Sequence, residues 1–526
     1  MMTAAIRRAD EAPFYATPLG VWLIVALWGA SHLLLRGSFS GALGTDDMFE
    51  TILVQKLSAG YMLRQPPLYE WLLWSAQQLV GPTIWAALLV KYGLISLASL
   101  FLFLLARRAI PDPRIAALCV FGFSLFYQFG WNLHEGVTHT IVLVFACAFT
   151  AWAFVRALET RSLWFYLLIG IGVGIGLLSK HSYPLFPLAL IGACVSDRVW
   201  RARLLLPGLV LSLAAALIVY SPYGYWIVSE GLALFSEVSA TMGLSDEVSH
   251  LQRAAQGLGR LVFALLGFSA PLVPIVLLLF WPRYVGLLAP SLVQRLGYEA
   301  FLTPKTDLSD VGRLLKRVVL IMIGLTALLI VITGATYVKE RHMHPLLLML
   351  PIWMFADLAR FDVGRRWRWL GVIVLAVVVI GFSARVPGMV APDRVMCGGG
   401  CRHMKPYEGI RDQLAALGAS EATLIGENDY TAGNLRVLFP DARIVSRSWP
   451  VIGGPRDKCF FVWEQGTDAP QTPAMEVASS RLGMTDEQAL SASYLAANWP
   501  HLWKPEGWRT TWWGVVELSS DTPLCR

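Results

Sequence analysis

The sequence predicts an α-helical membrane protein with about eleven spans and a small α/β domain at its C-terminal end. Hydrophobic residues make up 56% of the 526 residues and charged residues only 15%, whereas soluble domains carry about 25% charged residues. The 21 Trp and 16 Tyr residues suit a protein that meets two membrane interfaces. The net charge of +7 lies mainly in short loops between apolar runs. This is a topology signal, and it argues against nucleic acid as a partner.

Apolar runs of about 20 residues, the length that crosses the hydrocarbon core of a bilayer, define the expected spans. We place them at 16–35, 83–106, 115–131, 137–157, 163–178, 182–196, 204–221, 259–281, 317–337, 345–358 and 369–386. The first run follows Arg7 and Arg8 and is long enough to remain as a span instead of being cleaved as a signal peptide.

Arginine in alternate loops predicts the orientation of these spans. With a cytoplasmic N-terminus, every even-numbered connection is Arg-rich, as the positive-inside rule requires. These connections lie at 107–114, 156–161, 198–203, 283–317 and 360–368. The non-cytoplasmic side, expected to be the periplasm of a bacterium, then receives 36–82, 131–136, 179–183, 222–258, 338–344 and everything after about 387.

A change in composition after Pro387 divides the chain into a membrane domain, 1–386, and a periplasmic domain, 387–526. Short β-like runs and helical patterns alternate in the second part, which predicts an α/β domain. The β-like runs lie at 423–425, 443–445, 460–463 and 512–516, and the helical patterns at 405–417 and 472–481.

Cysteine usage agrees with this division. Cys397, Cys401, Cys459 and Cys525 lie in the predicted outside domain, where an oxidising compartment favours disulfides. We predict two, most simply Cys397–Cys401 and Cys459–Cys525. The alternative is a metal site built from Cys397, Cys401 and His403, but no second ligand pair at zinc-finger spacing accompanies it.

The first outside loop carries the most suggestive chemistry. Asp46 and Asp47 end a Gly-containing turn, and an amphipathic helix is expected over 48–59. The two acids can be a helix cap and a first-turn acid. Glu50, one turn further on, makes three acids, which exceeds what capping needs. They suit a general base for an acceptor hydroxyl or a divalent-cation site near a phosphate.

A corner with the sequence Arg64-Gln65-Pro66-Pro67 follows, and then a second, aromatic-rich amphipathic helix. The Pro-Pro pair forces an extended approach and starts the helix. Arg64 is either a snorkelling anchor or a contact for a phosphate.

Further ionisable residues fall on the same predicted side. His134 and His139 can be polar caps at a helix start, and Glu135 between them is a site candidate. Lys180 lies in a tight turn, where it either snorkels outward or holds a lipid phosphate or an acidic sugar.

The turn Lys339-Glu340-Arg341-His342-Met343-His344 is the densest charged turn expected outside. Arg341 is the first candidate for holding a leaving phosphate, together with Lys339. His342 and His344 are candidates for binding a metal or the acceptor. Charges near membrane depth are expensive and usually functional, so we expect all these groups to converge on one cavity.

The order of these motifs resembles the GT-C membrane glycosyltransferases, within them the superfamily of protein O-mannosyltransferases and lipid A aminoarabinose transferases. The amino-acid sequences of the motifs are most similar to the bacterial branch that includes the lipopolysaccharide galacturonosyltransferases. The resemblance covers roughly residues 15–355. It rests on the segments TDDMFETILVQ, RQPPLYEWLLW, GWNLHEGVTHT, GLLSKHSYPLFP and KERHMHPLLLMLP.

The resemblance implies a polyprenyl-phosphate sugar as donor and transfer with inversion at the anomeric carbon. Asp46 and Asp47 match the acidic pair of the family, one of which is the base or lies beside it, and Lys180 matches a cation of the aminoarabinose transferase. That enzyme has Glu-Lys-Pro where this chain has Arg64-Gln65-Pro66. Either Arg64 replaces that Lys, or Lys180 and Arg341 do its work, and use of a divalent metal ion stays open.

We therefore predict an inverting glycosyltransferase of the bacterial inner membrane that acts on lipid A, lipopolysaccharide core or another envelope glycan at the periplasmic face. Its excess of cations suits an acidic sugar such as a uronic acid. One alternative is a protein O-glycosyltransferase with the same type of donor. The alternative from another class is a lipid or solute transporter, which would favour internal repeats and midplane charges.

Overall fold

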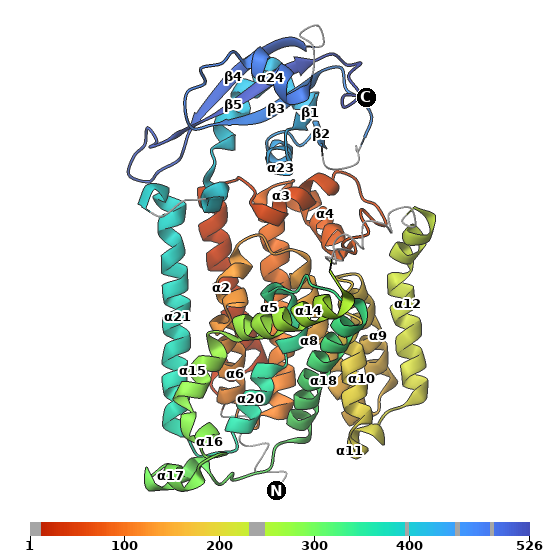
Figure 1. The fold of residues 1–526 in the computed structure, drawn as a ribbon, viewed down its shortest axis with the longest axis vertical. Helices are drawn as coiled ribbons and strands as arrows, with labels where there is room; N and C mark the ends of the chain where they lie inside the picture. The colour runs from red at the N-terminus through yellow and green to blue at the C-terminus, as the bar shows by residue number, and fades with distance from the viewer. Residues whose placement is uncertain (1–11, 231–247, 395–398, 448–452, 484–488) are drawn as a thin grey trace.

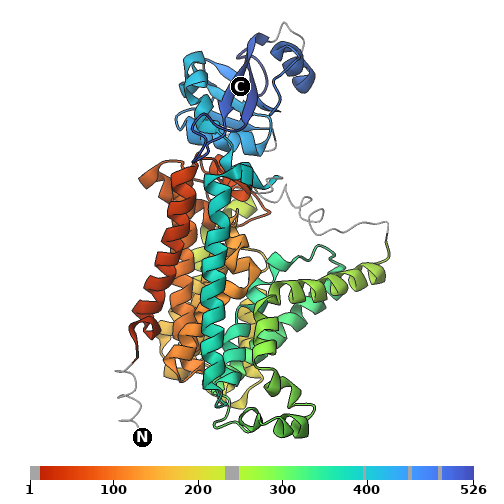
Figure 2. The same ribbon diagram turned by 90° about the vertical axis from the view of Figure 1, so that its left-hand side faces the viewer.

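The computed structural model describes residues 12–230, 248–394, 399–447, 453–483 and 489–526. A bundle of long helices carries a small sheet domain at one end (Figure 1). Seen from the side, the sheet domain continues the long axis of the bundle (Figure 2). The protein is therefore a multi-pass helical bundle with a separate mixed α/β unit on top.

Six described helices are long and apolar enough to cross a membrane. They are α2 (Pro18–Phe39), α5 (Ile84–Ala109), α8 (His139–Thr160), α12 (Leu206–Ser229), α18 (Asp310–Thr333) and α21 (Gly364–Val390). At about 1.5 Å per residue, 22 residues span about 33 Å, so even the shortest of them is sufficient. Among the six, α8 is the most enclosed, and it packs between α5 and the shorter helix α9.

Shorter apolar helices occupy four further predicted spans. They are α6 (Pro113–Phe121) with the 3-10 turn η2 (Gly122–Leu125), α9 (Leu163–Leu177), α10 (Leu185–Val195), and α19 (His344–Leu347) with α20 (Leu350–Leu358). Each is shorter than a full crossing needs, and neighbouring helices cover it.

The single span expected over 259–281 is wrong. The chain forms α14 (His250–Ser269), then breaks at Ala270–Pro271, and continues as the short α15 (Leu272–Leu279). Pro271 has no backbone N–H to donate, which ends a helix. Polar residues such as Gln252, Arg253 and Arg260 alternate with apolar ones along α14, and this helix lies across the bundle (Figure 1). The small helices α16 (Trp281–Val285) and α17 (Pro290–Arg295) follow at the end remote from the sheet.

The first loop contains the two expected helices, α3 (Thr45–Leu53) and α4 (Leu68–Val80). The first is shorter than the predicted 48–59 and begins earlier. The chain leaves the helix because residues after Val54 make other bonds: the Trp71 indole N–H donates to Ser58 O at 2.7 Å, and Ser58 N donates to the Tyr61 hydroxyl at 3.1 Å.

The C-terminal unit is a five-stranded mixed sheet in the order β2-β1-β3-β5-β4. The strands are β1 (Thr423–Gly426), β2 (Arg443–Ser446), β3 (Cys459–Gly466), β4 (Ala489–Asn498) and β5 (Thr510–Leu518). β1 pairs in parallel with β2 and β3, and β5 pairs antiparallel with β3 and β4. The helices of the unit are α22 (Arg411–Leu417), α23 (Asp429–Leu438) and α24 (Ala474–Leu482). All four predicted strands are present, and β4 was missed.

One predicted disulfide is confirmed. Cys459 and Cys525 are bonded, which ties the start of β3 to the C-terminal end of the chain. The other prediction, Cys397–Cys401, involves Cys397, which lies outside the described residues.

The α/β unit is docked on the first loop through α23, which packs against α3 (Figure 1). Leu43 N donates to the Asn434 side-chain oxygen at 2.7 Å. The Gln55 amide exchanges two hydrogen bonds with the backbone of Ile444, at 3.0 and 2.9 Å. At Gly433 the backbone of α23 lies directly against the backbone of Met48. The first loop is therefore held from above by the last domain of the chain.

Candidate active site

The residues singled out in the sequence lie at the end of the bundle that carries the sheet. Figure 1 shows α3 and α4 directly below α23, whereas α11 (Arg198–Arg201), α16 and α17 lie at the opposite end. The separation of Arg-rich connections from acidic loops matches the predicted topology. It does not, however, bring all the candidates into one cavity: they form three neighbouring groups.

The two adjacent acids Asp46 and Asp47 point into different surroundings. Asp47 is buried, with 4% of its surface exposed, whereas Asp46 is exposed. Burial raises the pKa of Asp47, and the nearby cations Lys91 and Arg36 oppose this. Partial burial and the carboxylates of Asp47 and Glu50 raise the pKa of Asp46, and Arg341 opposes this. Of the pair, Asp46 is the one that a substrate can reach.

The first group is a buried ion cluster around Asp47. The Lys91 ammonium, fully buried in α5, donates to the Glu135 carbonyl at 2.6 Å. Arg385, from α21, pairs with the Glu135 carboxylate at 2.9 Å. Arg36, from the end of α2, donates to Ser40 O at 2.8 Å and also to Ala42 O. Three cations against two carboxylates leave this cluster with a positive balance.

This cluster surrounds a small cavity of about 80 Å³. Besides the ion cluster, its lining includes Arg402 and His403 from the segment that leads into the α/β unit. The last part of the chain thus closes the top of the cluster. None of Arg36, Lys91 and Arg385 was identified in the sequence. A lone Lys in the apolar run ALLVKYGL was the available signal, because a charge at such depth needs partners.

His134 belongs to the wall of this cluster. Its Nδ1 shares a hydrogen bond with the Tyr92 hydroxyl at 2.8 Å, and its ring stacks on His32 with centroids 3.7 Å apart. Burial lowers the pKa of His134 well below its usual value. This environment gives His134 a neutral, packing role in the wall.

The second group joins the first loop to the start of α8. The His139 Nε2 atom lies 3.0 Å from Glu50 Oε1 and 3.6 Å from Glu70 Oε1. All three side chains are buried. Glu70, on α4, was missed because it stands in the aromatic segment LYEWLLW, which was interpreted only as an interfacial helix. His139 was interpreted as a possible helix cap, and it is the first residue of α8.

The third group consists of cations on the exposed side of Asp46. The Lys180 ammonium is an electrostatic neighbour of Arg341, Asp46 and Arg64. Burial, with Arg341 and Arg64 adding to it, lowers the pKa of Lys180 to about 8. Arg64 and Arg341 are both exposed. Lys180 and Arg341 are therefore electrostatic neighbours of the accessible Asp46, and Arg64 is a neighbour of Lys180.

The tight turn after α9 fixes Lys180 against the first loop. His181 bonds through Nε2 to Leu63 O at 2.6 Å, one residue before Arg64. Leu68 N donates to Leu178 O at 3.1 Å, which joins the start of α4 to the end of α9. The short connection between two apolar helices thus aims Lys180 at the corner of the first loop.

The dense turn 339–344 contributes to this group unequally. The Arg341 guanidinium donates to the Tyr337 hydroxyl at 3.1 Å, and Lys339 lies 4.6 Å from the centre of the same ring. Burial and the nearby Lys180 lower the pKa of His342 to about 4, so it is neutral. His344 donates from Nδ1 to Arg341 O, 2.8 Å away, and packs on Phe129 and other rings of the bundle. These contacts give His344 a packing role.

Known proteins resemble the chain over most of its length. The lipopolysaccharide core galacturonosyltransferase RgtB of Rhizobium johnstonii is 29% identical over 477 residues, which is 89% of this chain and 92% of that protein. RgtA of the same organism, also described as a lipopolysaccharide core galacturonosyltransferase, is 28% identical over 82% of this chain and 83% of its own. Residues 64–226 match the family model described as dolichyl-phosphate-mannose-protein mannosyltransferase.

The chain is a membrane glycosyltransferase, and its matches fit the GT-C type. Its fold agrees: the structure of ArnT from Cupriavidus metallidurans bound to undecaprenyl phosphate aligns with a TM-score of 0.56 at 14% identity. The alignment covers 95% of this chain and 98% of that one. This identification favours the enzyme over the transporter alternative.

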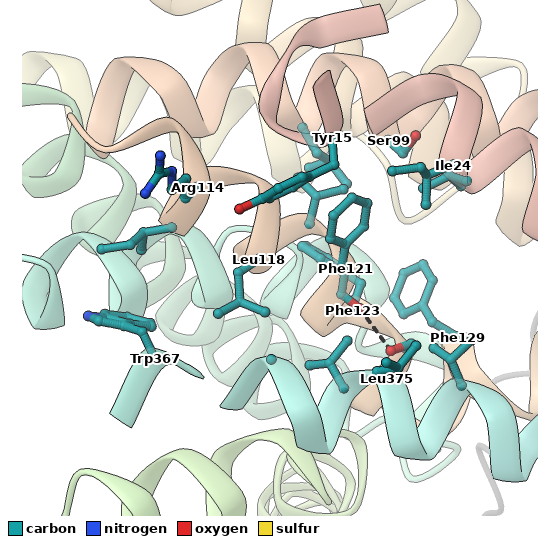
Figure 3. A pocket seen from close by; sticks show the side chains of 18 of the residues that line it. Tyr15, Ile24, Ser99, Arg114, Leu118, Phe121, Phe123, Phe129, Trp367 and Leu375 are labelled. Carbon is teal, nitrogen blue, oxygen red and sulfur yellow. Dashed lines mark hydrogen bonds between the residues drawn. The ribbon is translucent and has the colours of Figure 1, made fainter. Parts of the chain in front are cut away.

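A second, larger cavity of the glycosyltransferase lies away from the acidic groups. It has a volume of about 880 Å³ and is lined mainly by apolar and aromatic side chains of α2, α5, α6 and α21. Figure 3 shows Phe121, Phe123, Phe129, Trp367 and Leu375 facing it, with Arg114 at one end. It shares no lining residue with the small cavity at Asp47. This apolar lining is suited to binding hydrocarbon chains and not to binding a sugar.

Proposed function

We propose that the glycosyltransferase moves a uronic acid from a polyprenyl-phosphate donor to lipid A or lipopolysaccharide core at the periplasmic face of a bacterial inner membrane. RgtA and RgtB, each matched over more than four fifths of its length, support the acidic sugar and the lipopolysaccharide acceptor. The undecaprenyl phosphate named with ArnT supports the type of donor. The Arg-rich connections at the end remote from the sheet support a periplasmic site.

One observation carries the assignment of the reaction centre: Asp46 is the accessible acid of the pair, Lys180 and Arg341 are its electrostatic neighbours, and Arg64 lies beside Lys180. A displacement at an anomeric carbon needs a base on one side and a stabilised leaving group on the other. A carboxylate with cations beside it supplies both.

In this mechanism Asp46 accepts the proton of the acceptor hydroxyl while that oxygen attacks the anomeric carbon from the face opposite the phosphate. The bond between the anomeric carbon and the phosphate oxygen breaks, and its electron pair leaves with the polyprenyl phosphate. Inversion follows from attack at the opposite face. A raised pKa suits Asp46 for this role, because a base works best when its pKa approaches the working pH.

The cations Lys180 and Arg341 stabilise the departing phosphate, and Arg64 adds to the positive field. Preorganised charges of this kind contribute about 3–4 kcal/mol each in a partly dry site. Three cations exceed the charge of one phosphate monoester leaving group, so the excess suits the carboxylate of a uronic acid. Asp47 and Glu135 hold the loop in place through Lys91, Arg36 and Arg385.

The test compares the lipid A and core glycoforms of four strains by mass spectrometry: wild type, deletion, and deletions complemented with Asp46→Asn or Asp441→Asn. Asp441 is an exposed acid of the α/β unit that belongs to none of the three groups, and it serves as the control. We expect one glycoform to vanish on deletion, with a mass loss of one hexuronic acid. Asp441→Asn should restore it, and Asp46→Asn should not, because loss of a general base costs about 10²–10⁴-fold.

Full restoration by Asp46→Asn at normal membrane levels would show that the base lies elsewhere. The family model over 64–226 favours protein hydroxyls as the second candidate acceptor. Envelope glycoproteins from the same strains distinguish the two: a lost modification on Ser or Thr, with unchanged lipopolysaccharide, assigns the acceptor to protein.

A further inference from the structure

Three helices each contribute one ionisable side chain to a single buried site beneath the catalytic loop. Glu50 comes from α3, Glu70 from α4, and His139 from the first turn of α8. Their side chains are 3%, 0% and 2% exposed. Neither Lys nor Arg forms an ion pair with either carboxylate among the described residues.

The positions of the ligand atoms suit a metal ion. One atom from each of the three side chains lies within 4.8 Å of the other two, and His139 Nε2 is 3.0 Å from Glu50 and 3.6 Å from Glu70. Metal bonds of about 2.0–2.2 Å to nitrogen and oxygen place neighbouring ligand atoms roughly 3.0–3.5 Å apart. The observed separations fall in or next to this range without any rearrangement of the helices.

Several polar atoms here have no hydrogen-bond partner in the described part of the chain. These atoms are Glu50 Oε2, both carboxylate oxygens of Glu70, Nδ1 of His139 and the hydroxyl of Tyr69. A buried polar atom without a partner costs about 1–3 kcal/mol, and more when charged. A site with this many buried polar atoms without partners, most of them carboxylate oxygens, needs a positively charged ligand or a proton shared between the two carboxyl groups.

We propose that Glu50, Glu70 and His139 bind one divalent cation of the Zn²⁺ or Mn²⁺ type, which fastens α3 and α4 to α8. Two carboxylates balance the charge of the ion, which a buried site requires. The mixture of one imidazole nitrogen with carboxylate oxygens selects transition metals over Mg²⁺ or Ca²⁺.

The ion positions the catalytic loop. Glu50 stands on α3 one turn after Asp46 and Asp47, so fixing Glu50 fixes the direction in which Asp46 faces. Glu50 and Glu70 are positioning residues in this scheme. The proposal does not depend on the sugar or the acceptor, and its tests read metal content and thermal stability, which a wrong assignment of the reaction would leave unchanged.

The experiment uses the full chain purified in detergent without added metal, then exposed to a chelator and titrated with Zn²⁺ or Mn²⁺ alone. We expect about one equivalent of metal per chain by elemental analysis. We expect the chelator to lower Tm by about 2–5 °C and either ion to restore it, because a ligand that binds only the folded state stabilises it. Co²⁺ substitution supplies a visible spectrum that reports nitrogen and oxygen coordination.

Glu70→Gln keeps the shape of the side chain and removes one ligand charge, so its metal content should fall at least tenfold and its Tm should no longer respond to chelator. Gln77→Leu, a buried polar position on the same helix, is the matched control and should bind metal like the wild type. If Glu70→Gln fails to fold, the wild-type titration and Co²⁺ spectrum decide alone. Less than a tenth of an equivalent after titration, or equal metal in Glu70→Gln, overturns the proposal in favour of a carboxyl pair that shares a proton.

Discussion

The contact between α23 and α3 makes a quantitative prediction about Gly433. A Cβ atom at this position would lie 2.4 Å from the carbonyl oxygen of Met48 and 2.8 Å from its Cα. These are backbone atoms of the helix that carries Asp46, so no side-chain rotation relieves the clash. Ordinary contact begins at 3.4 Å, and Gly433→Ala must therefore separate the two helices by about 1 Å.

A displacement of about 1 Å in a positioned catalytic group can cost about 10²-fold in rate, and overpacking of this kind destabilises by about 1–3 kcal/mol. We expect Gly433→Ala to reach the membrane at a normal level and to transfer sugar about 100-fold more slowly. The assay is the initial rate of transfer from a purified polyprenyl-phosphate sugar, measured together with Tm.

Gly454→Ala is the matched control, because a Cβ at Gly454 meets nothing within 4 Å. It should leave rate and Tm unchanged. A Gly433→Ala protein with a lower Tm and a wild-type rate would mean that docking only stabilises the enzyme. A protein unchanged in both would refute the argument that the α/β unit positions the catalytic loop.

Two further predictions concern charge and covalent structure. The pKa of Lys180 is lowered to about 8, so its cation is present below that pH and is lost as the pH rises through it. The rate of transfer should decline above about pH 8, and Lys180→Arg should move this decline to higher pH because Arg stays charged. Lys56→Arg, at an exposed position, is the control and should have no effect. If the decline does not move in Lys180→Arg, another group causes it. Cys459 and Cys525 are 66 residues apart, and a loop of this length is worth about 4 kcal/mol. Cys459→Ser should therefore lower the Tm of the α/β unit and expose it to protease, whereas an unchanged Tm would show that the bridge adds little.

The membrane part of the fold was accessible from the sequence because hydrocarbon imposes strict rules on length and charge. Apolar runs located ten of the eleven expected helical segments. The Arg-containing helices α11, α16 and α17 lie at the end of the bundle opposite the sheet. The failure at 259–281 has a physical cause. The mean hydropathy over residues 259–281 reveals neither the polar residues along one side of α14 nor the break at Pro271.

The candidate site was predictable only in part. Asp46 and Asp47 are neighbours in sequence and chemically alike, and only the packing of α3 between α23 and the bundle makes one accessible and the other buried. Lys91 and Glu70 were missed for the same reason. Each is a single polar residue within an apolar or aromatic helix, and its partner lies on an element distant in the chain.

The hydrogen bond between Leu43 and Asn434 joins residues 391 positions apart, and this has a consequence for biosynthesis. At about 5–20 residues per second, the ribosome needs roughly 20–80 s after α3 emerges before α23 exists. During that interval the first loop lacks the domain that covers it in the folded chain. The first loop therefore reaches its final packing only after the last domain has been made, and a chain that stops before α23 lacks the contacts that hold this loop.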